Sequence, residues 1–275
     1  MQEFDTLSSM IGEVSPGDLA DWLIGQGRHF ITTDDAAGVL GVRAASVPAS
    51  LERARKARKV ISVTKRGWVP VPPEFRSAGA PPPSHFIHQL MDHLGHPYYV
   101  GFLSAAAILG ASHQAPMVFQ VVAPARLRRR RIGRSRIQFI QRAAAGERPR
   151  WQYGVPTGRI WVSSPEVTAL DLVESPQDGA GLSNVATVCG ALLMDGSLNP
   201  EALASAAAMY PAAVAQRCGY IIDLMASECG AEFDTAPLQA LVAGCRYRHL
   251  SPSGGGGRHD PRWHIVVNAE IEHDL

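Results

Sequence analysis

The sequence has few cysteines and no long apolar run. Its 275 residues include four cysteines, none in a CxxC pair, which excludes a disulfide-stapled framework. No apolar stretch approaches the roughly 20 residues needed to cross a bilayer, and residues 1–14 carry Glu3, Asp5 and Glu13 instead of a basic leader. We therefore expect a soluble, cytoplasmic protein with reduced and mostly buried thiols.

The sequence also lacks the local motifs of several enzyme classes. No phosphate-binding GxxxxGK[ST] loop, no GxSxG nucleophile elbow and no HExxH metal motif is present. The glycine run at 254–257 is not followed by the start of a helix, so it predicts a flexible loop and not a phosphate cradle. Nothing in the sequence supports catalysis or a cofactor, and we expect neither.

Charge is distributed unevenly along the chain. Residues 1–150 hold 20 Lys+Arg against 11 Asp+Glu, whereas residues 151–275 hold 6 against 14, so a formal net charge of +1 conceals halves of +9 and −8. The positive charge concentrates in residues 43–66 and 126–150, each of which contains a single acidic residue. Such asymmetry predicts that one end of the protein meets a polyanion.

Residues 16–70 predict three helices and a hairpin. Ser15-Pro16 is typical of a helix start, Thr32 or Thr33 is a candidate cap for a second helix, and Ser46 is expected to open a third. In this third helix Val47, Leu51, Ala54 and the stem of Arg58 recur at helical spacing as one buried stripe. A strand over 60–63, a turn over 65–67 and a return strand complete the order of a winged helix-turn-helix.

The third helix and the hairpin carry the candidate DNA-binding residues. A helix fits the major groove, and cations beside it can fix the register on phosphates. For groove entry we choose Ser46, Ser50, Arg53 and Lys56; for phosphate contacts, Arg43, Arg55, Lys59, Lys65 and Arg66. The alternative is an amphipathic helix with a solvated basic face, which does not explain why eight of nine charges share one sign across helix and hairpin.

Six prolines between residues 69 and 83 predict an interdomain connector. We therefore expect a winged-helix domain over residues 1–80 and a second domain over 84–275. The second region begins with a helix over 84–95 and another over 103–109, followed by strands over 117–122, 128–132, 136–140 and 159–162. Helices over 165–174, 182–194, 200–209, 212–227 and 237–243 precede a last strand over 264–269. The predicted fold is α+β, with a small sheet and several helices.

Arginines 126–136 have three interpretations. If residues 128–132 and 136–140 are strands, Arg128 and Arg130 share one face, and Arg136 lies on the half-exposed next strand. Arg128, Arg130, Arg134 and Arg136 could make a second contact to DNA, which we favour slightly. They could instead protect an edge strand from aggregation, or pair with the acidic half of the chain.

Two further clusters are weaker candidates. A metal site needs three or four ligands with a second shell. His85, His88, His93 and His96 lie close together in the sequence but lack such a second shell, so we expect no metal there. Glu166 and Asp171 are five residues apart, which fits helical neighbours poorly. We interpret Glu166 as a first-turn acid and Asp171 as part of an ordinary polar face.

Three segments in order resemble the AbiEi-type antitoxins. They are residues 98–106 (YYVGFLSAA), residues 161–172 (WVSSPEVTALDL) and residues 215–222 (AQRCGYII), and the resemblance extends from the winged-helix region to about residue 230. The chain departs from the family at Val167, where the family often has an arginine.

The resemblance implies a repressor of its own toxin–antitoxin operon, with an N-terminal winged helix that binds repeats in double-stranded DNA upstream of the gene pair. It also implies a C-terminal domain that counters a nucleotidyltransferase-like toxin. One alternative is an adaptor whose acidic C-terminal surface docks on the toxin, with DNA binding secondary. Another is an RNA-binding module that uses the arginine strand.

Overall fold

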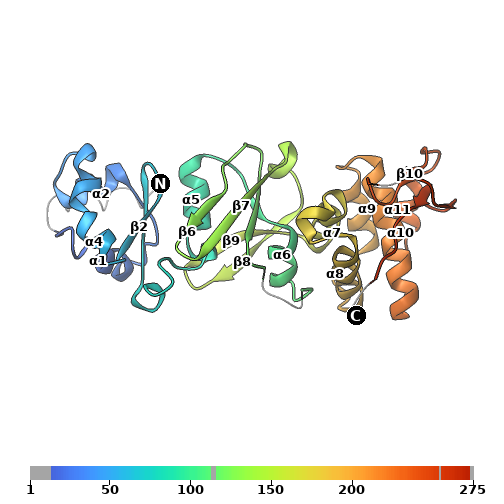
Figure 1. The fold of residues 1–275 in the computed structure, drawn as a ribbon, viewed down its shortest axis with the longest axis horizontal. Helices are drawn as coiled ribbons and strands as arrows, with labels where there is room; N and C mark the ends of the chain where they lie inside the picture. The colour runs from blue at the N-terminus through green and yellow to red at the C-terminus, as the bar shows by residue number, and fades with distance from the viewer. Residues whose placement is uncertain (1–13, 113–115, 254, 273–275) are drawn as a thin grey trace.

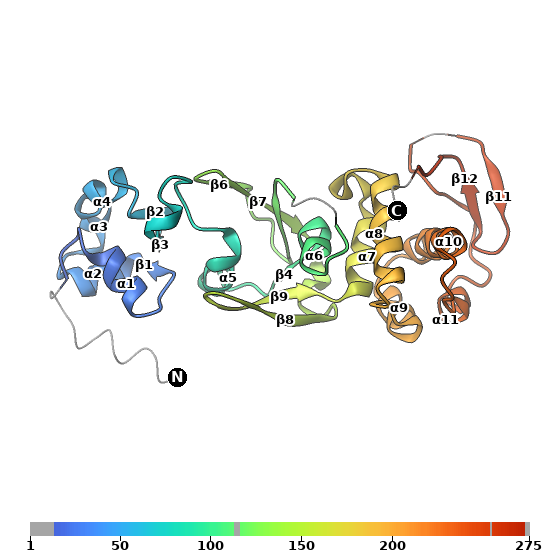
Figure 2. The same cartoon turned by 90° about the horizontal axis from the view of Figure 1, so that it is seen from below.

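A computed structural model describes residues 14–112, 116–253 and 255–272. The protein is mixed α+β, and three hydrophobic cores follow one another along its long axis (Figures 1 and 2). None of the described helices is long and apolar enough to cross a membrane. The middle sheet contributes to two of these cores, because Phe139 packs in one with the N-terminal hairpin and Ile140 packs in another with the C-terminal helices.

The N-terminal part combines short helices with a three-stranded antiparallel sheet of order β1-β3-β2. Its elements are α1 (Leu19–Gly25), β1 (Ile31–Thr32), α2 (Thr33–Leu40), the 3₁₀ turn η1 (Ala44–Ser46), α3 (Val47–Ser50), α4 (Glu52–Lys56), β2 (Val60–Thr64) and β3 (Gly67–Pro70). The Thr32 hydroxyl accepts the Asp35 backbone N–H and caps α2, as predicted. Gly41 ends α2 in the left-handed conformation, which glycine adopts without steric cost.

The third predicted helix is present but divided. Val47, Leu51 and Ala54 are buried, which confirms the predicted stripe. Ser46 is the N-cap residue of α3, as predicted, although its side chain makes no cap hydrogen bond. One detail of the prediction is wrong. Arg58 is exposed with φ 54°, so it lies beyond the end of α4 and adds nothing to the buried face.

The proline-rich connector is packed against the protein. It contains the 3₁₀ turns η2 (Pro73–Phe75) and η3 (Pro83–His85), and Val71 and Ala80 are buried. Phe30, Val63 and Val69 of the N-terminal part join Ala80 in the core of the middle part. The hairpin β2–β3 therefore packs on the body that follows it, which fixes the two relative to each other.

The middle part is a six-stranded sheet of order β6-β7-β5-β4-β9-β8. Its elements are α5 (Ile87–Leu94), β4 (Tyr99–Val100), α6 (Phe102–Ile108), β5 (Phe119–Ala123), β6 (Arg130–Ile132), β7 (Ser135–Gln141), η4 (Ala143–Gly146), β8 (Arg150–Val155) and β9 (Gly158–Ser163). The sheet is mixed, since β5 pairs parallel with β7 and β4 with β9. The predicted turn at Gly133-Arg134 is confirmed, whereas the edge strand β8 was not predicted because neither of its faces is buried.

The C-terminal part is helical and ends in a small sheet of order β10-β12-β11. Its elements are α7 (Pro165–Glu174), η5 (Pro176–Gly179), α8 (Leu182–Met194), α9 (Pro200–Ala207), α10 (Ala212–Cys229), α11 (Ala236–Ala240), β10 (Arg248–His249), β11 (Arg258–Asp260) and β12 (Ile265–Val267). The helices match their predicted ranges closely, with Ser164 capping α7. The predicted loop at 254–257 lies partly outside the described residues.

Candidate nucleic-acid interface

Helix α4 presents a cationic face to solvent. Arg53, Arg55 and Lys56 are exposed, while Ala54 faces the core. Glu52 pairs with Arg55 at 2.8 Å and with Lys56 at 3.8 Å, all on the same short helix. Ion pairs this exposed contribute at most about 1 kcal/mol and exchange easily for other partners. The cationic face therefore stays accessible. Of the predicted residues that precede α4, Arg43 is exposed, and Ser46 and Ser50 are half-buried.

Two of the predicted phosphate contacts in and before the hairpin already have acidic partners. Arg66 at the hairpin tip donates to Asp34 over 2.7 Å, with both side chains more than half exposed. Lys59, which is less exposed, donates to Asp21 over 3.2 Å and to the Gly17 carbonyl over 3.1 Å. Lys65 is exposed at the tip. Lys65 and Arg66 can thus reach a ligand at low cost, whereas Lys59 first has to leave α1.

The arginine strand β6 forms an edge of the six-stranded sheet and faces the hairpin. Arg130 donates its Nη1 to the Val63 carbonyl over 2.6 Å, and burial lowers the pKa of its guanidinium. Arg130 therefore joins the two bodies, whereas Arg128, Arg134 and Arg136 are exposed. The ion pairs of the described residues do not connect residues 126–136 to any carboxylate, so the third interpretation, pairing with the acidic half, has no ion pair to support it there. A strand edge covered with charge remains consistent with the other two interpretations.

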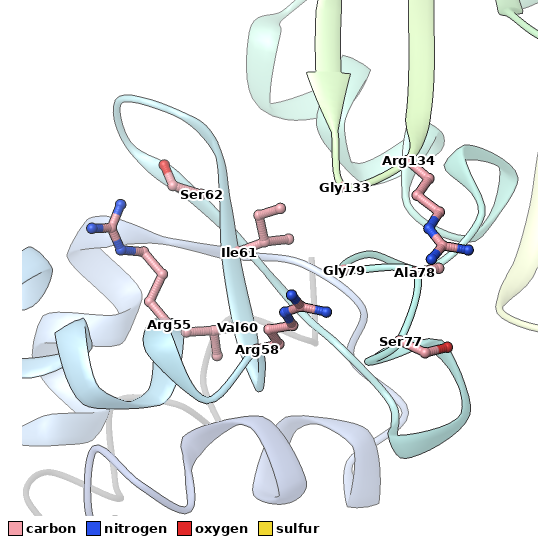
Figure 3. Close-up of a pocket in the computed structure, with 10 residues that line it drawn as sticks. All are labelled: Arg55, Arg58, Val60, Ile61, Ser62, Ser77, Ala78, Gly79, Gly133 and Arg134. Atoms are coloured by element: carbon pink, nitrogen blue, oxygen red, sulfur yellow. The ribbon is translucent and has the colours of Figure 1, made fainter.

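A cleft of about 490 Å³ lies between the two basic segments (Figure 3). Arg55 and Arg58 line it from the N-terminal part, and Arg134 lines it from the turn between β6 and β7. Arg55 and Arg134, which are 79 positions apart in the sequence, thus line one positively charged cleft. No acidic side chain lines this cleft, so its lining favours an anion.

The wall of the cleft is held by a close backbone approach. The Arg134 N–H donates to the Ala78 carbonyl over 3.0 Å. Gly133 has φ 59°, and a β-carbon added there would lie 2.6 Å from the same carbonyl oxygen. Only glycine combines this conformation with this contact. The turn and the connector are therefore locked together, and the basic segments keep a fixed separation.

The histidines of the predicted cluster occupy separate contacts. His93 lies against Phe30, His85 against Phe75 and His88 against Tyr98, with ring centroids 5.2, 5.4 and 6.1 Å apart. In the described part of the chain, no three His, Cys, Asp or Glu side chains gather as metal ligands would. These rings contribute to packing between elements instead.

The prediction for Asp171 as an ordinary polar residue is wrong. Its carboxylate is fully buried between the middle sheet and the C-terminal helices. It accepts hydrogen bonds from Tyr99 and Tyr210, each over 2.8 Å, and pairs with Arg148 at 2.5 Å. Burial raises the pKa of Asp171 to about 6, against the lowering effects of Arg148 and the two hydroxyls.

The network continues to the surface of α7. Arg142 donates to Glu174 over 2.7 Å and to the Ser175 hydroxyl over 2.6 Å, and Glu174 lies 3.7 Å from Arg148. Local spacing gave no sign of this network, because its members come from residues 99 to 210. The one available signal was the position of Asp171 among Leu170, Leu172 and Val173, inside a helix whose neighbours are apolar. The network joins the middle sheet to the C-terminal helices through buried hydrogen bonds and ion pairs.

This architecture is similar to one known protein family and to a solved structure. Residues 99–224 match the family model described as the AbiEi antitoxin C-terminal domain. The fold is similar to the crystal structure of the RV2827C protein from Mycobacterium tuberculosis, with a TM-score of 0.62 and 15% sequence identity over 95% of this chain and 91% of that one. A comparison with curated proteins gave no significant match. At this identity the structural likeness concerns the fold alone, and it extends to the N-terminal part that the family match leaves out.

Proposed function

Residues 99–224 belong to the AbiEi antitoxin C-terminal domain family, and from this premise we propose that the chain is a DNA-binding antitoxin. It represses its own toxin–antitoxin operon and counteracts a nucleotidyltransferase-like toxin. Residues 1–80 bind the operator repeats and residues 84–275 antagonise the toxin. The protein acts by binding and not by catalysis.

The N-terminal part serves as a winged helix-turn-helix in this proposal. Helix α2 and the α3–α4 segment correspond to the helix-turn-helix, and the β2–β3 hairpin corresponds to the wing. A helix about 10–12 Å across fits the major groove of B-form DNA. The Lys65-Arg66 tip of the wing extends to the adjacent backbone. The order of elements and the antiparallel sheet support this assignment.

The exposed cationic face of α4 is the observation that carries the proposal. Arg53 and Lys56 point away from the buried stripe, and the one carboxylate paired with α4 among the described residues is its own Glu52. A face neutralised by other elements would be structural; this face is free to exchange Glu52 for phosphates. Base-specific contacts come from Ser46, Ser50, Arg53 and Lys56, and phosphate contacts from the surrounding cations.

The arginine strand supports a longer contact with the same duplex. Arg134 shares a cleft with Arg55 and Arg58. Arg128 and Arg136 are exposed and near Arg134 in the sequence, so we extend the proposed DNA contact beyond α4 to these three arginines. Each phosphate neutralised contributes about −0.9 to the slope of log affinity against log salt concentration. Charge-neutral variants of these three arginines should therefore make the slope shallower by about 2.7.

The test uses the full chain, because the hairpin shares its core with the middle part. Binding to DNA from upstream of the gene is measured by gel shift for the Arg53→Glu/Lys56→Glu variant and for an Arg159→Glu control on β9. The first variant should lose operator binding and still rescue cells that express the toxin, while the control keeps both. Retained operator binding by the double variant would reject the assignment of α4, as would loss of rescue with binding intact.

Direct toxin contact is the second candidate function, and the net charge of −8 over residues 151–275 favours it. An acidic surface attracts a basic partner and speeds its association. In this alternative the toxin co-purifies with the chain, and the Arg53→Glu/Lys56→Glu variant retains it. If the toxin does not co-purify but operator binding is intact, repression is the main activity.

A further inference from the structure

The C-terminal sheet gathers cations within the acidic half of the protein. Residues 151–275 contain six arginines and no lysine, and five of the six are Arg217, Arg246, Arg248, Arg258 and Arg262. Four of these lie in or beside β10, β11 and β12, and Arg217 of α10 donates to the His249 carbonyl of β10 over 2.9 Å. An acidic region that places nearly all of its positive charge on one small sheet has a localised anion-attracting surface there.

Tyr247 gives this sheet an exposed aromatic platform. Its side chain is 40% exposed, which is unusual for a large aromatic residue in this protein. The His259 ring is tilted by 30° against the Tyr247 ring, with centroids 4.7 Å apart, and His264 meets Tyr247 edge-on at 5.4 Å and 79°. Three rings from separate segments thus support one another. Such packing orders a ring that would otherwise rotate freely, and an ordered exposed ring is suited to stacking.

The register of the sheet separates the aromatic and the cationic side chains. His249, Val266 and His259 lie directly opposite one another across the three strands, so they share a face. Arg248 and Arg258 occupy the alternate positions of β10 and β11, so their side chains leave the sheet on the opposite face. Arg246 and Arg248 are exposed, and no ion pair of the described residues engages either of them. Along the edge of the sheet formed by β10, exposed guanidinium groups therefore precede and follow the Tyr247 ring and are available to a ligand.

A cleft of about 370 Å³ opens beside the platform. It is lined by His264, whose ring also meets Tyr247, and by Arg262, Gln239 and Pro261 among others. Arg262 is held in place by Asp223 at 2.9 Å and by the Thr235 hydroxyl at 2.8 Å. The cleft thus offers hydrogen-bonding groups and is large enough for a nucleobase.

We propose that this surface binds single-stranded nucleic acid. Bases without a stacking partner pack on aromatic rings, and the phosphates between them pair with arginine; both groups are present here in alternation. Duplex DNA is a poorer fit, because its bases are already stacked. The surface lies at the opposite end of the molecule from α4 (Figures 1 and 2) and mostly outside residues 99–224. It is therefore a second nucleic-acid site, independent of the proposed operator contact.

The test measures binding of a labelled oligonucleotide to the full chain by fluorescence anisotropy. Probes of about 12 nucleotides, oligouridylate and oligothymidylate, cover the usual site size and compare RNA with DNA. The Arg53→Glu/Lys56→Glu background removes the proposed operator site, so any remaining binding belongs to another surface. We expect binding to persist in that background. Complete loss there would overturn the proposal and leave the operator assignment unaffected.

Substitutions at the platform test the stacking contact. Tyr247→Leu should weaken binding about 5- to 150-fold, which corresponds to the loss of about 1–3 kcal/mol of base stacking. Tyr247→Phe keeps the ring and should stay within about twofold. Arg246→Gln/Arg248→Gln should make the salt slope shallower by about 1.4, whereas the exposed control Arg159→Gln should change nothing. Unchanged binding by Tyr247→Leu would refute the site.

Polyglutamate distinguishes the competing class of ligand. If the surface instead recognises an acidic protein, polyglutamate will compete with the oligonucleotide at equal charge. In that case competition will depend on Arg246 and Arg248 but not on the ring of Tyr247. That pattern would overturn the proposal. Failure of polyglutamate to compete, together with a loss in Tyr247→Leu, supports a nucleic-acid site.

Discussion

Replacing Arg148 with methionine tests whether the buried network holds the middle sheet to the C-terminal helices. Arg148 is 5% exposed and Asp171 is fully buried, and their atoms approach to 2.5 Å. The guanidinium also lies over the Tyr210 ring, 3.9 Å from its centroid. Methionine matches the aliphatic stem but removes the charge, so the Asp171 carboxylate is left buried without its cation.

We expect Arg148→Met to lower the free energy of unfolding by about 3–5 kcal/mol at pH 8, the usual cost of removing one partner from a buried ion pair. Adding Asp171→Asn should restore at least about 2 kcal/mol, because it removes the stranded charge. The assay is urea unfolding followed by far-ultraviolet circular dichroism. The exposed Arg159→Met on β9 serves as a control and should change stability by less than about 0.5 kcal/mol.

The pH dependence of this variant has a definite sign. Burial raises the pKa of Asp171 to about 6 even with Arg148 present, and without the cation the pKa should rise further. The native state then binds the proton more tightly than the unfolded chain does. This contribution to stability is present in full below the ordinary pKa near 3.8 and is lost as the pH rises through the folded-state pKa.

The deficit of Arg148→Met relative to the wild type should accordingly shrink as the pH falls from 8 to 5.5. Compared with the Asp171→Asn single variant, the double variant should show a deficit that does not change with pH in this range, since neither protein carries the titrating group. A deficit that stays constant in the single variant would show that the pair does not carry the charge balance argued above. A double variant no more stable than the Arg148→Met single variant would show the same.

Two glycines give further predictions. A β-carbon at Gly219 would lie 2.1 Å from the buried ring of Trp263. Gly219→Ala should therefore lower the free energy of unfolding, measured by thermal unfolding, by at least about 2 kcal/mol. Gly38 has open space around it, so the control Gly38→Ala should be neutral or stabilising. Gly133→Ala brings its β-carbon against the Ala78 carbonyl and should separate the β6–β7 turn from the connector, seen as faster protease cleavage within residues 76–84. An intact connector would contradict the lock described here.

Local patterns in the sequence were sufficient for most helices. The spacing of Val47, Leu51 and Ala54 predicted the buried face of the third helix, and the helix predicted over 165–174 matches α7. These signals depend on near neighbours, which helical periodicity and caps reflect directly. Strand β8 escaped prediction, because an edge strand with two half-exposed faces has no such periodicity.

The sequence by itself determined the two basic segments, the element order and the family motifs, since each is a property of residues close together in the chain. Only the tertiary structure decided which of these residues meet. It brought Arg134 to the cleft of Arg55 and Arg58, and it buried Asp171 among partners up to 72 positions away. It also collected the arginines of an acidic half on one sheet. Contacts of this kind arise from packing between elements, so they cannot be predicted from the charge or spacing of a single segment.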